Sequence, residues 1–272
     1  MSWLDEPLTT AALCWRIERC DGVAIGLTAH DRDLLIDGLL HRASPGMLPS
    51  AISRTGGLEP DTMDVTGALV ADAVNAADLL AGRWDGARVT LFAADWTAPG
   101  AADRRVPLGE GTIGAVTLSE GGFTAELMGA TVALDRPVVE DTAPECRAAL
   151  GDRRCRVPMA ARRRLARVVA ADGGELVLDA AEPVADAYGN GRLRWIGGAN
   201  SGLASAVARS AGERVTLAAA PPFAVQGGEL IELEQGCDKS IATCAGRFGN
   251  AANFRGEPFL PGIDLLTRYP GA

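Results

Sequence analysis

Lysine, histidine and aromatic residues are all scarce in this chain of 272 residues. Acidic residues (35) outnumber basic ones (26), the net charge is −9, and Lys239 is the only lysine. Proteins that coat nucleic acid or dock on anionic lipid normally carry basic surfaces, so this balance argues against both classes. Aromatic residues make up only 5% of the chain, whereas glycine (33) and proline (15) are plentiful. This composition favours many short elements joined by turns.

Long apolar runs are also lacking. Because no stretch approaches about 18 uninterrupted apolar residues, we expect no transmembrane helix. The opening residues 1–7 have neither a basic n-region nor an apolar h-region, so we expect no secretory signal and a chain that folds in a cytoplasm. In that reducing compartment, six cysteines favour free thiols or metal ligands over disulfides.

Familiar catalytic motifs are missing as well. The sequence has no Gly-x-Ser-x-Gly, no His-Glu-x-x-His and no phosphate-binding glycine loop. The two histidines, His30 and His41, are the remaining candidates for acid–base chemistry. Asp31 could orient the ring of His30, but this pair lies in an expected turn and no nucleophile motif accompanies it. We therefore interpret His30 as a turn residue and assign no role to His41.

Alternating apolar residues predict strands through the first half of the chain. Leu13, Trp15 and Ile17 alternate with Cys14, Arg16 and Glu18, which is the period-2 pattern of a half-buried strand. Further strands are expected over residues 23–29, 34–40, 88–94, 113–118 and 123–128, and residues 44–60 are expected to form a loop. One helix is predicted, with Leu69, Ala73, Ala76, Ala77 and Leu80 on its buried face and Gly82 at its end.

The second half predicts short strands at roughly ten-residue spacing. They cover residues 165–170, 176–178, 192–196, 207–209, 215–218 and 230–233. This spacing is typical of a small antiparallel barrel or sandwich. We expect turns at Gly109-Glu110-Gly111 and Gly197-Gly198, and we interpret the run 162–164 (Arg-Arg-Arg) as a solvated segment or a protein contact. Residues 135–160 interrupt the pattern, so the sequence predicts a mainly β protein with some helix and two domains, 1–140 and 141–272.

The clearest chemical signal is four cysteines in two pairs. Eight residues separate Cys146 from Cys155 and six separate Cys237 from Cys244, and both pairs lie in irregular, Pro- and Gly-rich sequence that can bend to aim several thiolates at one point. Structural zinc sites usually space their ligands more tightly, whereas the larger iron–sulfur cluster tolerates wide spacing. Iron–sulfur, zinc, disulfides and unliganded thiols all remain open on spacing alone.

Cys14 and Cys20 lie far upstream in strand-like sequence. They are six residues apart, which would place them on the same face of one extended strand and too far from each other to bond. A buried free cysteine behaves as a small apolar residue. We interpret both as residues that fill the core or the surface.

A longer pattern follows the last cysteine pair. Residues 236–244 have the sequence Gly-Cys-Asp-Lys-Ser-Ile-Ala-Thr-Cys, and 247–250 (Arg-Phe-Gly-Asn), 253–256 (Asn-Phe-Arg-Gly), Pro258 and Pro261-Gly262 follow. This pattern resembles the C-terminal signature of tail-tip hub proteins from long, flexible phage tails, and in particular the hub of alphaproteobacterial gene transfer agents. The first half, which opens with a hairpin containing Trp and Cys, is similar to the N-terminal domain of the same proteins. The resemblance spans essentially the whole chain, and its C-terminal motif is the specific part.

The resemblance implies a cofactor. Related tail-tip proteins of lambda-type phages hold a [4Fe-4S] cluster with four cysteines of their C-terminal part. The corresponding ligands here would be Cys146, Cys155, Cys237 and Cys244, with spacings that agree with the family, while Cys14 and Cys20 lie outside the pattern. Nearby residues would then pack over the cluster or form a contact between subunits: Arg247, Phe248, Asn253, Phe254 and Arg255.

The resemblance also implies an architectural role without enzymatic activity. Family hubs form homotrimeric rings at the tail tip (baseplate) of the virion, in which each chain supplies two tube-type β-barrel domains and DNA passes through the lumen without sequence-specific binding. Their expected neighbours are the distal tail protein, a large tip or fibre protein of the megatron type and a tail-associated peptidase. Two alternatives stay open: an iron–sulfur redox or electron-transfer protein, and a tail-associated cell-wall hydrolase, which would need better-placed histidines.

Overall fold

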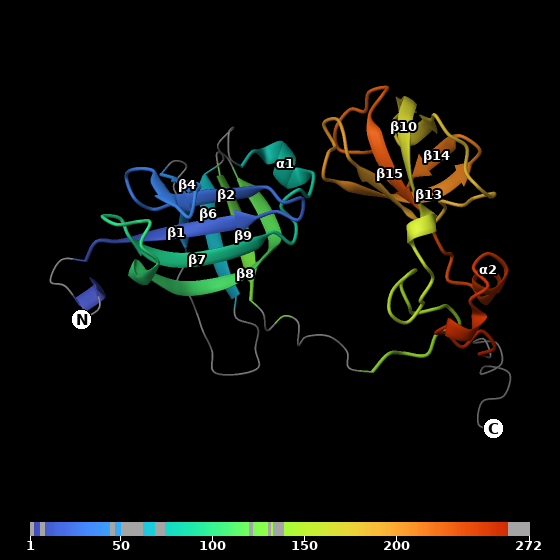
Figure 1. Ribbon diagram of the computed structural model, residues 1–272, viewed down its shortest axis with the longest axis horizontal. Coiled ribbons are helices and arrows are strands. Elements are labelled where there is room, and N and C mark those ends of the chain that lie inside the picture. The colour runs from blue at the N-terminus through green and yellow to red at the C-terminus, as the bar shows by residue number, and fades with distance from the viewer. Residues whose placement is uncertain are drawn as a thin grey trace. The chain divides into compact units, whose positions relative to one another are not determined.

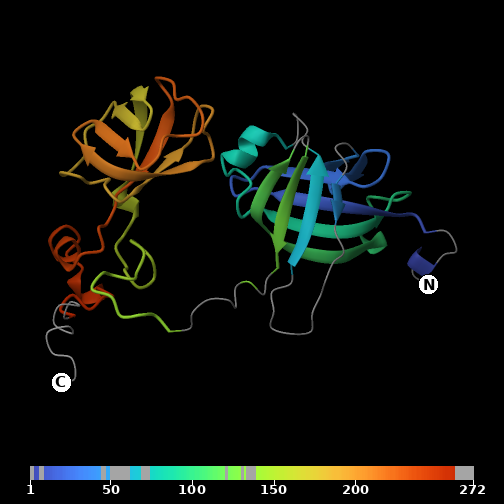
Figure 2. The same cartoon turned by 180° about the vertical axis from the view of Figure 1, so that it is seen from behind.

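The chain folds into two compact units, Met1–Val138 and Val139–Ala272 (Figures 1 and 2). The structure, a computed structural model, describes residues 3–5, 9–43, 47–49, 62–68, 74–119, 122–129, 132 and 139–260. Strands dominate both units, which confirms the mainly β expectation, and the predicted domain boundary lies two residues from this division. In the part of the chain that the structure describes, no helix is long and apolar enough to cross a membrane.

The first unit is a nine-stranded sheet in the order β3-β4-β2-β1-β7-β8-β9-β6-β5, with β2 and β4 parallel and the other neighbours antiparallel. Its elements are η1 (Trp3–Asp5), β1 (Ala11–Glu18), β2 (Ala24–Thr28), β3 (Leu34–Ile36), β4 (Leu39–Arg42), β5 (Met47–Pro49), β6 (Thr62–Ala68), α1 (Ala76–Leu80), β7 (Arg88–Asp95), η2 (Ala102–Arg104), β8 (Arg105–Ser119) and β9 (Gly122–Met128).

Both faces of the central strand β1 are covered. Trp15 and Ile17 lie in the main apolar cluster with Leu91 of β7, as their alternation predicts. Cys14, on the opposite face, is fully buried in a smaller cluster with Leu34 and other apolar residues. A strand buried on both faces need not alternate apolar and polar residues. The second face of β1, which the sequence predicts to be exposed, is therefore partly buried, because Cys14 lies in an apolar cluster there.

The predicted strand 34–40 is wrong, because the structure has two strands there. Asp37 and Gly38 both have positive φ (49° and 75°), and they turn β3 back onto β4 in a tight hairpin. An Asp-Gly pair is favoured at such turns because both central residues need positive φ. The predicted loop 44–60 likewise contains β5, and its other residues lie outside the described part of the chain.

Two further expectations for the first unit are wrong. The segment Gly109-Glu110-Gly111 lies inside β8, not in a turn, and a Cβ on Gly111 would come within 2.5 Å of the Met128 carbonyl oxygen. The described helix is α1 alone, in which Leu79 is buried and Leu80 is 77% exposed, so the predicted face is reversed at its end. Residues 69–73 of the predicted helix lie outside the described residues.

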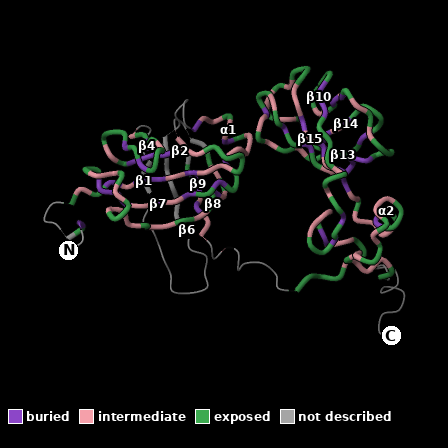
Figure 3. Tube along the Cα trace, viewed as in Figure 1, coloured by how far each residue is buried: buried purple, intermediate pink, exposed green. Residues whose placement is uncertain are grey.

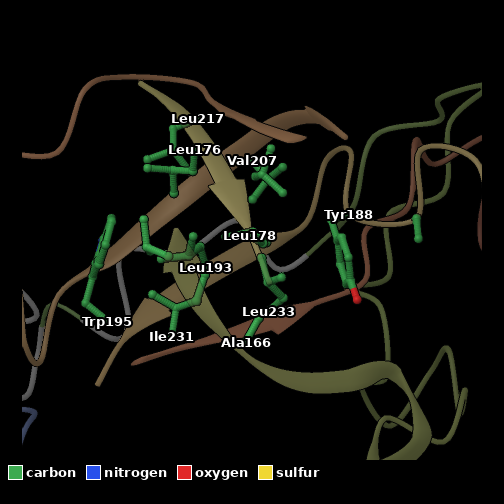
Figure 4. Packing of buried hydrophobic residues seen from close by; sticks show 13 residues of the cluster. Ala166, Leu176, Leu178, Tyr188, Leu193, Trp195, Val207, Leu217, Ile231 and Leu233 are labelled. Atoms are coloured by element: carbon green, nitrogen blue, oxygen red, sulfur yellow. The ribbon is translucent and has the colours of Figure 1, made fainter. Parts of the chain in front are cut away.

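The second unit contains a closed six-stranded barrel in the order β10-β11-β14-β13-β12-β15. All six strands were expected close to where they lie: β10 (Arg163–Asp172, preceded by η4, Ala160–Arg162), β11 (Glu175–Leu178), β12 (Arg192–Trp195), β13 (Ala204–Ala211), β14 (Arg214–Leu217) and β15 (Leu230–Glu234). Their alternate residues fill the interior, where Leu193, Trp195 and Ile231 are almost fully buried (Figure 4). Closure removes the exposed strand edges that an open sheet would leave.

The rest of the second unit, residues 139–159 and 235–260, is called the cysteine region below. It consists of irregular chain with two short helices, α2 (Ile241–Gly246) and η5 (Ala251–Asn253). Its apolar cluster is small: Ala148, Cys155 and Val157 are buried, and a few partly buried side chains pack against them. Figure 3 shows buried positions on the strands of the barrel and fewer of them along this region.

Candidate metal centre

The four predicted ligands all lie in the cysteine region, two in each of its segments. Cys146 and Cys155 belong to the loop before the barrel, Cys237 follows β15 closely, and Cys244 is buried in α2. Burial raises the pKa of the Cys244 thiol, and the neighbouring thiols of Cys146, Cys237 and Cys155 raise it further. Burial also raises the pKa of Cys237, with Cys146 again contributing. The fold therefore brings together two pairs of thiols that are separated by more than 80 residues in sequence.

The loop that carries the first two cysteines is organised by one carboxylate. Asp152 accepts hydrogen bonds from the backbone N–H groups of Cys155, Arg154 and Ala149 at 2.6, 2.8 and 2.9 Å. The bond from Cys155 is the main reason that the pKa of Asp152 is lowered. Short polar side chains favour turns by bonding nearby backbone N–H groups in this way. Asp152 thus holds the chain in the turn that presents Cys155.

The segment that carries the second pair is held by two side-chain caps. Ser240 caps α2 by accepting the N–H of Thr243 at 3.1 Å. Asp238 accepts the Ser240 N–H at 2.9 Å and the Thr243 hydroxyl at 2.8 Å. A helix of six residues gains little from its own hydrogen bonds, so its caps matter more than usual. Together they fix the short stretch of chain that links Cys237 to Cys244.

Long-range bonds join the two segments. Arg147 forms a bidentate ion pair with Glu257, at 2.6 and 2.8 Å, and its backbone N–H donates to the Arg255 carbonyl at 3.0 Å. Asn250 donates to the Cys155 carbonyl at 2.6 Å. A Cβ on Gly256 would overlap the Glu145 carbonyl oxygen, so the backbones approach closely here. These contacts hold the first cysteine pair beside the second.

Two N–H groups point at the sulfur atoms themselves. The Arg255 backbone N–H donates to the Cys146 Sγ at 3.4 Å, and the Asn250 Nδ2 lies 3.7 Å from the Cys155 Sγ. Hydrogen bonds of this kind stabilise and tune metal-bound thiolates. The sequence pointed to Arg255 as a site residue but not to Asn250 or Asp152, because polar residues in irregular chain carry no periodic signal.

The other residues expected around the centre take different positions. Phe248 packs against the small apolar cluster of the cysteine region. The Arg247 guanidinium donates to the carbonyls of Gly236 and Ala185, both at 3.4 Å, and Asn253 donates to Asn250 at 2.7 Å. The expectation that this group covers a cluster or forms a subunit contact stays a prediction.

The remaining cysteines and the histidines lie in the first unit. Cys14 is buried, but Cys20 lies beyond the end of β1 and is exposed, so the expectation of one shared strand face is wrong. His30 lies in a turn, as expected, with its Nδ1 2.6 Å from the Asp31 carboxylate. His41 is buried in β4, where burial lowers its pKa and its Nδ1 lies 3.1 Å from the Leu39 carbonyl oxygen. His41 is therefore packed inside the first unit.

The donor set at the centre suits a thiophilic metal. All six cysteines are free thiols, and Cys146, Cys155 and Cys237 lie close enough to the buried Cys244 to raise the pKa of its thiol. Burial and mutual repulsion disfavour thiolates, whereas a bound metal cation deprotonates a coordinating thiol outright. Soft thiolate ligands select zinc or iron–sulfur over hard cations. Among the described residues, no group of three or more His, Cys, Asp or Glu side chains is arranged to hold a single metal ion.

Comparisons with known proteins cover almost the whole chain. Residues 1–158 match the family "Baseplate hub protein, N-terminal attachment domain", and residues 186–264 match "Phage conserved hypothetical protein BR0599". A chain in a solved structure, "Virion of native gene transfer agent (GTA) particle", is 35% identical with a TM-score of 0.85, and the match covers 98% of this chain and 94% of that one. A search of curated proteins gave no match.

The first family alone spans more than half of the chain, and the likeness to the particle protein extends through both units. The chain belongs to the baseplate hub protein family.

Proposed function

We propose that this chain is the structural hub at the tail tip of a phage-like particle of the gene-transfer-agent type. The observation that carries the proposal is the likeness, over 98% of the chain, to a protein of a gene transfer agent virion, together with its membership of the baseplate hub family. Its role is architectural. The hub connects the tail tube and distal tail protein to the large tip or fibre protein, and a tail-associated peptidase is a further neighbour.

In this proposal three copies form a ring through which DNA passes. The charge distribution supports a passage for DNA, since the first unit has 19 acidic and 10 basic residues, whereas the second has 16 of each. The whole excess of −9 therefore belongs to the first unit. An acidic lumen wall repels DNA phosphates and lets the genome slide without sticking.

The four converging cysteines hold a [4Fe-4S] cluster. Cys146, Cys155, Cys237 and Cys244 supply the thiolates, and the N–H groups of Arg255 and Asn250 bond their sulfurs. When bound, the cluster supplies four metal–thiolate links between the loop before the barrel and the segment after it. The chain's own residues orient the thiols, and Phe248 packs with the few apolar side chains of the small cluster that contains Cys155.

Particles that lack this chain test the hub role. We expect tubes without tips and no DNA delivery, and crosslinking of complete particles should give trimers with contacts to the distal tail protein and the tip protein. Normal delivery by particles without the chain would remove the hub role. A hexameric or monomeric copy number at the tip would remove the three-fold ring.

Anaerobic purification of the full chain tests the cofactor. We expect brown protein with close to four iron and four sulfide per chain, and a colourless, poorly soluble Cys237→Ser variant. Cys14→Ser is the matched control and should stay brown, because Cys14 lies in the core of the first unit. Stoichiometric zinc in place of iron, or full iron in Cys237→Ser, would overturn the assignment.

A further inference from the structure

We infer that Lys239 is a positioning residue that fastens the two cysteine-bearing segments to each other before any metal binds. The inference deepens the proposed function, because the thiols that Lys239 positions are the proposed cluster ligands. Lys239 is the only lysine of the chain and lies two residues after Cys237. It contacts the stretch 146–148 through both its backbone and its side chain.

The backbone contact requires an unusual conformation. The Lys239 carbonyl accepts the Cys146 N–H at 2.9 Å, and this residue has a φ of +64°. A residue other than glycine is disfavoured at positive φ, in the left-handed region. It keeps this conformation only where its surroundings enforce it. The carbonyl therefore reaches Cys146 in a backbone conformation that glycine would adopt more easily.

The side-chain contact explains why this position is not glycine. The Lys239 Nζ donates to the carbonyl of Ala148 at 2.6 Å, and Ala148 is only 2% exposed. A charged donor on a largely buried carbonyl makes a stronger hydrogen bond than a neutral pair does. Lys239 thus forms hydrogen bonds with the segment 146–148 at two points, Cys146 and Ala148.

The two points together hold one ligand of each pair in register. Cys146 is bonded to the residue that follows Cys237 by two positions, so the segment 237–239 and the segment 146–148 cannot slide past each other without breaking both bonds. Holding thiols in place before the metal arrives lowers the entropy cost of closing the site. This role belongs to the protein alone, so it is measurable without iron.

Arg156 provides a matched control within the same region. It is also a basic residue with a positive φ (+62°), and it directly follows the ligand Cys155. Within the described residues, its Nε donates to the Arg153 carbonyl at 3.4 Å, inside its own loop. Replacing Arg156 therefore changes charge and side chain next to a cysteine without breaking a bond between the segments.

The test measures thiol exposure in the metal-free, reduced full chain. Alkylation of each cysteine is followed by mass spectrometry in the parent protein and in K239M, K239R, K239G and R156M. We expect Cys146 and Cys237 to react about tenfold faster in K239M, the factor that loss of a hydrogen bond from a charged donor gives. Cys14 should react unchanged, R156M should match the parent, and K239R should recover part of the protection.

The glycine variant tests whether backbone strain in K239M, and not loss of the side-chain hydrogen bond, causes faster alkylation. K239G removes the side chain and also relieves the positive φ, so its backbone is less strained than that of K239M. We expect faster alkylation in K239G as well, with the barrel intact by circular dichroism. Parent-like rates in both K239M and K239G, or equal acceleration in R156M, would overturn the role of Lys239.

Iron loading separates this inference from the proposed cofactor. If the parent chain binds no iron, the cluster proposal fails while the alkylation rates still decide the role of Lys239. If the parent binds iron and K239M alkylates at the parent rate, the cluster stands and the positioning role is lost. If both hold, we expect K239M to load iron more slowly from ferrous iron and sulfide.

Discussion

The barrel and the cysteine region belong to the same unit but are held together in different ways. The barrel encloses a continuous apolar core, in which Trp195, Leu193 and Ile231 are almost fully buried (Figure 4). The cysteine region buries only Ala148, Cys155 and Val157 in its apolar cluster. Its order comes from side-chain caps, long-range hydrogen bonds and one bidentate ion pair.

The contrast supports the role proposed for the four cysteines in a chain with few aromatic residues. Burial of apolar surface contributes roughly 25 cal/mol per Å², so a small apolar cluster offsets only part of the entropy cost of ordering an irregular loop. Exposed ion pairs add little. A metal cluster would supply the missing stabilisation in one place, which is why small metal-binding domains often fold only with their metal.

The largest expected effect comes from Cys237→Ser, compared with the iron-loaded parent protein. We expect the cysteine region to become sensitive to proteolysis while the barrel stays protected, since metal–thiolate sites contribute about 10–16 kcal/mol in small zinc domains. Limited proteolysis followed by mass spectrometry measures both regions at once. Cys20→Ser is the control, because Cys20 is exposed in the first unit. Equal resistance of both regions in Cys237→Ser would show that the comparison is wrong.

Trp195→Ala should produce the converse result. Trp195 is 1% exposed and donates to the Ser205 hydroxyl at 3.0 Å, so truncation leaves a cavity that costs about 3–5 kcal/mol. Urea denaturation of the barrel measures this loss, and iron content under native conditions should not change. Trp195→Phe retains most of the volume and should cost less. A loss of iron in Trp195→Ala before the barrel unfolds would mean that the two regions are not distinct.

Acid should loosen the cysteine region before it loosens the barrel core. The ion pair with Arg147 lowers the pKa of Glu257 from 4.5 to about 2. The folded state then binds this proton less tightly than the unfolded state, so the contribution to stability is complete above about pH 4.5 and is lost as the pH falls towards 2.

Amide exchange of residues 139–159 in the metal-free chain measures this effect. We expect protection of the parent chain to be complete above about pH 4.5 and to fall as the pH is lowered from there towards 2. Glu257→Gln should be less protected at neutral pH and should change less with acid. An unchanged acid response in Glu257→Gln would assign the sensitivity to another carboxylate, such as Asp152, whose pKa is also lowered.

The smallest expected effect concerns one contact between the barrel and the cysteine region. The Arg162 guanidinium, at the start of the barrel, lies 5.2 Å from the ring centre of Phe248 in the cysteine region. A double-mutant cycle with Arg162→Met and Phe248→Leu should give a coupling of about 0.5–1 kcal/mol. Arg163→Met is the control, because Arg163 pairs with Glu234 on the barrel. No coupling would mean that this contact does not link the two regions.

Local patterns predict most of the strands because each pattern reports a local cause. Residues 165–170 and 230–233 alternate since one side of each strand faces the barrel core, and the structure places β10 and β15 there. The predictions fail where the same local pattern is compatible with two different structures. Gly109 and Gly111 favour a turn by composition, but the close approach of Met128 to Gly111 requires a residue without a side chain inside β8.

The sequence by itself determined a mainly β chain with four cysteines in irregular segments, because strand periodicity and residue type are local properties. Only the tertiary structure decided that these cysteines lie near one another. The pairing of β10 with β15 brings the segment before β10 close to the segment after β15, and with them the two cysteine pairs. The roles of Asp152, Asn250 and Lys239 also depend on that proximity. Their hydrogen bonds join groups that are distant in sequence or set in aperiodic turns, and no spacing rule predicts such bonds.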